Sequence, residues 1–136
     1  MIDTFLVAER TMVTGNGDSV AAEVSGASTR AFLLTLSITG VVEQEAIELS
    51  VLVSGDGATW EPKPIASLPQ KFYAGEYPLL INLADKPDVR FLRAHWEVSR
   101  WGRGPTAPRF ELGIRLREVP PELLGAPTGT ETALSR

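Results

Sequence analysis

Ser54-Gly-Asp-Gly-Ala-Thr-Trp60 directly follows a run, Ile47 to Val53, in which every second residue is apolar. Side chains on a strand alternate between two faces, so this run predicts a half-buried strand. Gly55, Asp56 and Gly57 then supply the backbone freedom and side-chain hydrogen bonding of a tight turn. Thr59 and Trp60 suit a return strand, with the indole folded back over the hairpin. The stretch therefore predicts a turn-rich, all-β protein.

The rest of the chain repeats this pattern. Further strands are predicted over residues 5–8, 20–24, 32–38, 77–83, 89–99 and 110–116, with a turn at 15–18. The expected inward-facing sets are Phe32, Leu34, Leu36 and Ile38; Leu92, Ala94, Trp96 and Val98; and Phe110, Leu112, Ile114 and Leu116. Three prolines keep residues 61–70 out of a central strand, and Pro78 moves its own strand toward an edge or a bulge. The sequence predicts a β-sandwich or jelly roll of about eight antiparallel strands.

Length and composition set the domain organisation. The 136 residues, 43% of them hydrophobic, fit one domain over residues 1–119. Residues 120–136 are small, polar and rich in Pro and Gly, which predicts a C-terminal arm whose apolar side chains are Leu123, Leu124 and Leu134. Neither a secretion signal nor an apolar run long enough for a membrane span is present, so a cytoplasmic protein without membrane insertion is expected.

Charge is distributed unevenly along the chain, whose formal net charge is −4. Residues 1–61 hold nine acidic and two basic side chains, whereas residues 86–117 hold eight basic and three acidic ones. One interpretation is that the two regions pair within the fold as neighbouring strands. The other is a basic face that meets an anion, an acidic partner or the acidic region of a second copy.

Part of the chain resembles a known family. Ser54, Asp56, Gly57, Thr59 and Trp60, with Arg90-Phe-Leu-Arg93 and the closing strand Phe110–Leu116, are similar to the second half of discoidin-type (F5/8 type C) domains, over about residues 46–118. The resemblance implies a galactose-binding-like jelly roll and, more weakly, carbohydrate binding through loops at one end of the barrel. Its matched residues are scaffold positions, and the family's binding loops do not align with this chain.

Two loop segments are candidates for contact with a ligand or a partner. In the first, Arg100-Trp-Gly-Arg103, an aromatic ring between arginines could stack on a sugar or base or bind phosphate, and Arg109 follows nearby. The alternative is that Trp101 covers the end of the sandwich. In the second, Lys71–Tyr77, Tyr73 belongs to an aromatic platform for a glycan or another subunit, unless Phe72 and Tyr77 are core residues.

Catalytic and metal chemistry have little support in the sequence. Cysteine is absent and His95 is the single histidine, so thiolate catalysis and His- or Cys-based metal sites are excluded. We expect His95 to hydrogen-bond a cross-strand carboxylate such as Glu111. Glu43, Glu45 and Glu48 with Asp56 are weak calcium candidates, since loop carboxylates are usually solvated. Neither a cofactor nor a resident metal is predicted.

The function predicted from sequence is non-catalytic. The leading hypothesis is a structural or assembly subunit of a homo-oligomer or a phage-like particle, such as a capsid decoration, tail or shell component. Its contacts would come from Arg100, Arg103, Arg109 and the arm. The alternative is a carbohydrate-binding or other ligand-binding module that uses Trp101 and Tyr73. A nucleic-acid partner is a weaker third possibility, because few aromatic residues accompany the basic ones.

Overall fold

The computed structural model describes residues 2–42, 44–101 and 108–120 of the chain. Within these ranges it contains nine strands and no helix, so no helix there is long and apolar enough to cross a membrane. The strands are β1 (Asp3–Val13), β2 (Gly17–Asp18), β3 (Ala22–Glu23), β4 (Ala31–Val41), β5 (Glu45–Ser54), β6 (Ala66–Lys71), β7 (Gly75–Asn82), β8 (Phe91–Arg100) and β9 (Phe110–Glu118).

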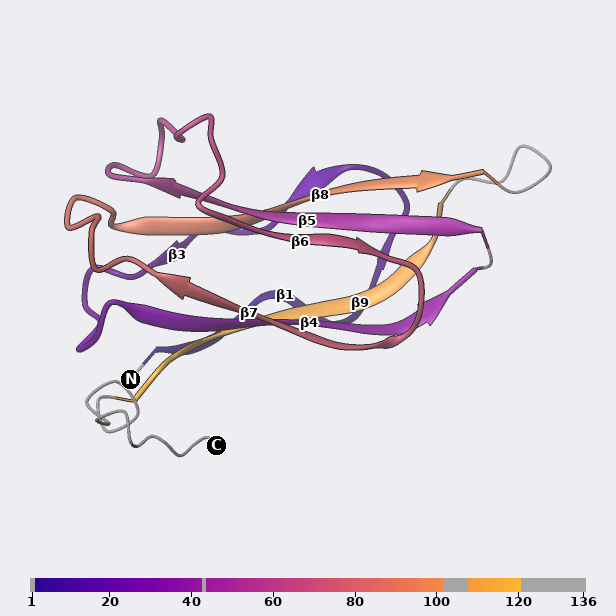
Figure 1. The fold of residues 1–136 in the computed structure, drawn as a ribbon, viewed down its shortest axis with the longest axis horizontal. Helices are drawn as coiled ribbons and strands as arrows, with labels where there is room; N and C mark the ends of the chain where they lie inside the picture. The colour runs from indigo at the N-terminus through magenta and orange to yellow at the C-terminus, as the bar shows by residue number, and fades with distance from the viewer. Residues whose placement is uncertain (1, 43, 102–107, 121–136) are drawn as a thin grey trace.

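Two antiparallel sheets pack face to face, as the two layers of Figure 1 show. The four-stranded sheet has the order β1-β9-β4-β7. The five-stranded sheet has the order β2-β8-β5-β6, and β3 also pairs with β8. Because β2 and β3 lie along the same edge of β8, they form one interrupted strand, and the whole then has the strand order of an eight-stranded jelly roll. The predicted all-β sandwich of about eight strands is confirmed.

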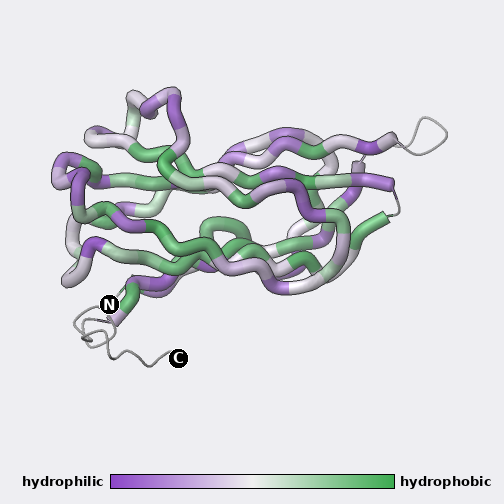
Figure 2. The backbone as a smooth tube through the Cα atoms, in the orientation of Figure 1, coloured by the Kyte–Doolittle hydropathy of each residue, from purple (hydrophilic) through white to green (hydrophobic). Residues whose placement is uncertain are grey.

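The hydrophobic core lies between the sheets and comes from the alternating strands. Figure 2 shows apolar positions along the strands of both layers and hydrophilic residues in many of the loops. The predicted inward positions of β4, β5 and β9 are all at most 2% exposed, Leu92 and Ala94 of β8 are fully buried, and Trp96 is 8% exposed. Val98 is half-buried against this core. Period-two alternation therefore identified the core faces correctly.

Proline marks two outer strands. Within the described residues β7 pairs with β4 alone, and it carries Pro78, as predicted for an edge. Residues 61–70 contain all of β6 except Lys71, and the sequence did not predict a strand there. β6 carries Pro69 and lies at an edge, beside β5. Proline lacks the N–H of a ladder hydrogen bond, so edge positions tolerate it.

Strand β1 contains a bulge opposite a glycine. In its pairing with β9 the register passes from Val7–Ile114 to Thr11–Leu112, so three residues of β1 face Gly113. Within the bulge Arg10 has a left-handed φ of 62°, and Thr11 Oγ1 donates a hydrogen bond to Ala8 O at 2.7 Å. A Cβ on residue 113 would lie 2.9 Å from the Cα of Glu9. The bulge therefore requires glycine at this position.

The loop Ser54–Trp60 is a turn, but the predicted return strand at Thr59–Trp60 is wrong. Trp60 makes one isolated bridge to Ser54, and the strand that returns beside β5 begins at Ala66. Ser54 and Asp56 hold the loop through side-chain bonds to the backbone N–H groups of residues 57–59. These bonds hold the chain in a compact loop. A two-residue hairpin would instead have continued the backbone pairing with β5 directly after the turn.

The predicted pattern of the N-terminal region is also corrected. The expected turn at 15–18 contains β2, and the expected strand at 20–24 is reduced to Ala22–Glu23, with Val20 65% exposed. Side chains cause the interruption: Ser19 Oγ accepts the hydrogen bond of Ala94 N at 2.9 Å, in place of a backbone carbonyl. Ladder pairing with β8 resumes at Ala22.

A buried carboxylate joins the beginning of the described chain to its last strand. Glu118 is 5% exposed and accepts hydrogen bonds from Ile2 N at 3.1 Å and Thr29 N at 2.9 Å. Burial by itself raises the pKa of Glu118, but the backbone N–H donors outweigh it and the pKa is lowered. Both ends of the described chain thus meet at one end of the sandwich (Figure 1). Of the predicted arm, only Pro120 lies within the described residues.

The acidic and basic regions of the sequence pair with each other inside the fold. In the part of the chain that the structure describes, each Lys or Arg ion pair links a base of residues 86–117 to an acid of residues 1–61. These pairs are Lys86–Glu61 and Arg90–Glu23 at 3.5 Å, Arg93–Asp18 at 3.7 Å and Arg115–Asp3 at 2.7 Å. Partial solvent exposure makes each of them weakly stabilising. The interpretation that the two regions are spatial neighbours is thereby supported.

Candidate functional site

The strands β1, β4, β6 and β8 end at the same end of the sandwich, away from the N-terminus and on the right in Figure 1. The described residues that follow β4, β6 and β8 there include 42, 44, 72–74 and 101. Neighbouring strands run in opposite directions, so connections that follow strands of the same direction lie at the same end. This arrangement brings together residues that are far apart in the sequence.

An exposed aromatic cluster, made of Phe72, Tyr73 and Trp101, occupies this end. The rings of Phe72 and Trp101 are 5.9 Å apart between centroids and lie edge to face at 76°, and those of Phe72 and Tyr73 are 6.3 Å apart at 59°. Phe72 is 40% exposed, Trp101 57% and Tyr73 76%. Aromatic side chains of this size are normally buried, so a contiguous exposed set is typical of a contact surface.

Hydrogen bonds from neighbouring elements hold the cluster in place. Trp101 N donates to Gln44 O at 2.9 Å, which ties the end of β8 to the β4–β5 connection. The hydroxyl of Tyr77, a half-buried residue of β7, donates to Tyr73 O at 2.7 Å. The Nζ of Lys71 also lies 4.9 Å from the centroid of the Tyr77 ring. The backbone that carries the rings is therefore fixed on both sides.

A buried carboxylate organises the floor beneath the rings. Glu45 is 1% exposed; its Oε2 accepts a hydrogen bond from Val42 N at 2.8 Å and its Oε1 accepts one from Arg109 N at 2.7 Å. Both carboxylate oxygens are thus engaged by backbone donors. The preceding residue, Gln44, has a left-handed φ of 63°, a conformation that is uncommon for a non-glycine residue and concentrates at functional sites.

The cluster borders a hollow of about 400 Å³. Val41, Val42, Gln44 and Glu45 line it together with the three rings. Ligand pockets range over about 300–1,000 Å³, so the hollow has the size of a site for a small molecule. Its walls offer aromatic faces and edges, while the Glu45 oxygens are already bonded to N–H groups. The arrangement is therefore suited to stacking rather than to proton transfer.

The sequence-predicted contact residues divide into three groups. Trp101 and Tyr73, predicted from separate segments, lie in the same cluster. Arg100 is half-buried at the end of β8, opposite Glu45 in the β5–β8 register, and Arg109 is exposed just before β9. Arg103, Leu123, Leu124 and Leu134 lie outside the described residues.

The sequence interpretation did not predict the roles of Gln44 and Glu45. It left open whether Phe72 and Tyr77 belong to an aromatic platform or to the core: Phe72 is exposed and packs on Trp101, whereas Tyr77 packs against the core. Glu45 was weighed as a calcium candidate, yet it is buried at the beginning of β5, with Asp56 beyond the strand's other end. Among the described residues no group of three or more acidic or histidine side chains is placed to hold a metal ion.

His95 bonds to a cross-strand carboxylate, as expected, but the carboxylate is that of Asp18 and not of Glu111. Its Nδ1 lies 2.9 Å from Asp18 Oδ1 and its Nε2 lies 3.3 Å from Glu97 Oε2. Glu111, the expected partner, instead accepts a hydrogen bond from Thr39 Oγ1 at 2.8 Å. The cause is the topology: β8 and β9 belong to different sheets, so they share no ladder.

Comparison with known proteins adds no functional assignment. No protein-family model matches the chain, and no characterised protein is detectably similar to it in sequence. The resemblance to discoidin-type domains and the ligand class that it implies therefore stay predictions.

Proposed function

We propose that this protein is a non-catalytic binding module whose ligand is a carbohydrate held at the aromatic cluster. The observation that carries the proposal is the hollow of about 400 Å³ bordered by Phe72, Tyr73 and Trp101. Exposed rings at fixed positions bind the apolar C–H faces of a sugar ring without needing to reorder first. A site at one end of the sandwich also agrees with what the discoidin resemblance implies.

The chemistry of the lining supports binding over catalysis. Among the described lining residues, Glu45 is the carboxylate, and its two oxygens accept hydrogen bonds from Val42 N and Arg109 N. A general acid or base must reach the proton that it transfers, and a paired carboxylic acid and base would be needed for glycoside hydrolysis. The role of Glu45 is structural, because its carboxylate links Val42, after β4, to Arg109, before β9.

A second candidate is the assembly subunit predicted from the sequence. The observation that favours it is an apolar pair, Leu33 and Leu80, which lie opposite each other on the outer face of the four-stranded sheet, with Leu80 63% exposed. An open apolar pair on a sheet face suits a subunit contact. The charge asymmetry that first suggested assembly supports it less, since the described ion pairs join the two regions within one chain.

A glycan screen with the full chain tests the binding proposal. We expect a bound oligosaccharide whose affinity falls about tenfold or more in Trp101→Ala or Tyr73→Ala, since stacking contributes about 1–3 kcal/mol per ring. Phe5→Ala is the matched control, because Phe5 is a similarly exposed aromatic residue on β1 outside the cluster. Isothermal titration calorimetry measures the affinities, and circular dichroism checks the fold of each variant.

Two results would contradict the proposal. One is the absence of binding across neutral, acidic and amino sugars at millimolar concentration. The other is binding that the cluster variants leave unchanged, or that Phe5→Ala weakens equally.

A further inference from the structure

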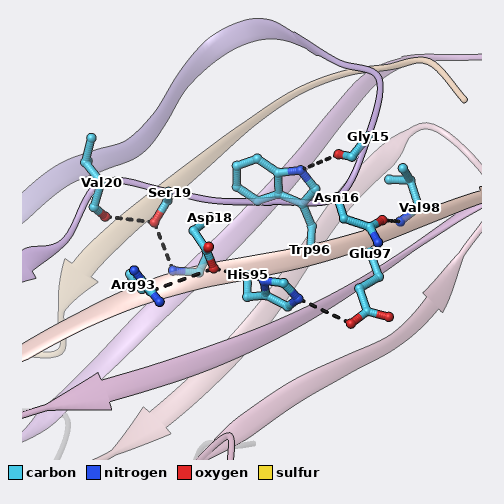
Figure 3. Close-up of polar contacts among 11 residues, drawn as sticks. Gly15, Asn16, Asp18, Ser19, Val20, Arg93, His95, Trp96, Glu97 and Val98 are labelled. Atoms are coloured by element: carbon cyan, nitrogen blue, oxygen red, sulfur yellow. Dashed lines mark hydrogen bonds and ion pairs between the residues drawn. The ribbon is translucent and has the colours of Figure 1, made fainter. Parts of the chain in front are cut away.

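A short segment, Gly15–Ser19, closes the outer edge of β8 and is named here the edge strap. It contains β2, which pairs Gly17 with Trp96 and Asp18 with His95. Figure 3 shows the strap lying along β8, with dashed lines between the two. An uncovered strand edge presents unpaired backbone groups to other chains, so the strap protects this sheet from unwanted pairing.

Side chains of the strap replace part of the missing backbone ladder. Asn16 Oδ1 accepts a hydrogen bond from Val98 N at 2.8 Å, and Ser19 Oγ accepts one from Ala94 N at 2.9 Å. In the opposite direction, the Trp96 indole N–H donates to a strap carbonyl, Gly15 O, at 3.0 Å. Ser19 N also donates to Ala94 O at 2.8 Å, and because β2 is two residues long, the strap is held on the edge by a small number of contacts.

His95 links the strap to β8 through both ring nitrogens. Nδ1 lies 2.9 Å from Oδ1 of Asp18, a strap residue, and Nε2 lies 3.3 Å from Oε2 of Glu97, on its own strand. Ionised carboxylates accept hydrogen bonds and donate none, and a neutral imidazole carries one N–H. The two contacts can therefore both be hydrogen bonds only when His95 is protonated.

The surrounding charges favour the protonated ring. On β8 the flanking side chains on the same face are Arg93 and Glu97, and Arg93 Nε lies 3.7 Å from Asp18 Oδ1. From β5, Glu48 stands directly opposite Glu97 and Ser50 opposite His95. His95 lines a second hollow, separate from the one beside the aromatic cluster. The β6 residues that line this second hollow are the uncharged Ser67, Leu68 and Pro69.

Two carboxylates, those of Asp18 and Glu97, thus contact one imidazole, and Arg93 accompanies Asp18. Burial lowers the pKa of His95, but the hydrogen bonds with Asp18 and Glu97 outweigh it, so the pKa is raised. Because the pKa is higher in the folded state, protonation of His95 stabilises the fold, and this stabilisation is complete at pH values below the unfolded-state pKa of about 6.5. The stabilisation is then lost as the pH rises through the folded value.

We propose that His95 makes the edge strap a pH-sensitive closure, which stays on β8 while the imidazole is protonated and loosens when it loses its proton. Deprotonation removes the N–H donor of one of the two carboxylate contacts and, with the positive charge, weakens the attraction of the ring to both Asp18 and Glu97. The loosened strap uncovers the N–H groups of Ala94 and Val98, which a further strand can then pair with. This device is independent of the aromatic cluster and of its ligand.

Residue-resolved hydrogen exchange on the full chain tests the proposal, from about pH 5.5 to about pH 8.5. After correction for the intrinsic increase of exchange with pH, we expect the protection of the Ala94 and Val98 amides to fall several-fold across this range. The amides of β4 that pair with β9 are the internal reference, and their protection should stay constant. A parallel NMR titration of the imidazole should give the same midpoint as the loss of protection.

Two variants make the outcome specific to His95. In His95→Gln, which does not titrate, the protection should be low and independent of pH. In His95→Lys, which stays charged, it should be high and independent of pH. A pH dependence that persists in His95→Gln, or that affects β4 and β8 equally, would overturn the proposal. Should His95→Gln fail to fold, Asp18→Asn removes the strap's partner and must also remove the pH dependence.

Discussion

Gly113 is the clearest case in which one residue decides local structure. Its missing side chain leaves room for the three-residue bulge of β1, whose backbone passes closest at Glu9. The neighbouring atoms are backbone atoms, so they cannot adjust as the end of a flexible side chain can. The position therefore couples the sequence of β9 to the path of β1.

We expect Gly113→Ala to lower the free energy of unfolding by about 1–3 kcal/mol, because the new methyl group forces a backbone shift. Urea denaturation measures the change. Gly26→Ala is the control: a Cβ at residue 26 meets no atom within 4 Å, so its effect should be within about 0.5 kcal/mol. Equal stability of the two variants would show that the bulge does not need glycine.

At this scale the sequence predicted burial well and special positions poorly. Alternation alone identifies Phe110 and Leu112 as buried, since strand geometry fixes the parity of each residue. The requirement for Gly113 depends on a bulge in β1, a strand that precedes it by about a hundred residues. Local patterns carry no information about such a partner.

Among the elements, the loop Ser54–Trp60 shows how polar side chains replace a hairpin. Ser54 is fully buried; its hydroxyl accepts a hydrogen bond from Gly57 N at 2.8 Å and donates one to Thr59 O at 2.6 Å. Asp56 Oδ1 accepts hydrogen bonds from Thr59 N and Ala58 N, and these bonds lower the pKa of Asp56. The loop is thus closed by its own side chains.

Ser54→Ala should therefore cost about 1–3 kcal/mol of stability, because it removes a buried hydroxyl that bonds Gly57 N and Thr59 O of the loop. Thermal and urea denaturation measure this cost against Ser67→Ala, which removes an exposed hydroxyl on β6. A neutral result for Ser54→Ala would mean that water satisfies the loop equally well.

The aromatic cluster shows how far the strand pattern predicts a site. Tyr73 and Trp101 were each recognisable as exposed aromatic candidates, and the two strands between them, β7 and β8, were both predicted over 77–83 and 89–99. The packing of Phe72 on Trp101 depends on the paths of the two loops in space, which local patterns do not specify. Gln44 and Glu45 gave no local signal of their roles.

For the whole molecule, the ion pairs between sequence-distant regions bear on the oligomeric state. Lys86–Glu61, Arg90–Glu23 and Arg115–Asp3 bring opposite charges together within one chain, so fewer remain to attract a second copy. The sequence left open whether these charges would pair inside the fold. Strand order, which composition does not specify, brings these oppositely charged side chains together within the chain.

Light scattering after gel filtration separates the two proposed functions. As a binding module, the full chain should elute as a monomer of 14.7 kDa, and so should a chain ending at Val119. A defined oligomer that is lost on removal of residues 120–136 would instead support the assembly subunit and assign the contact to the arm. Circular dichroism of the shortened chain confirms that it is folded.

The meeting of Ile2 and Glu118 at the end opposite the aromatic cluster has a practical consequence for orientation. A tether attached near Ile2 or after Glu118, to a surface, a carrier domain or a larger particle, therefore holds the molecule at the same end of the sandwich. The rings of Phe72, Tyr73 and Trp101 then point outward into solution, so many copies on one support would display them as a multivalent array.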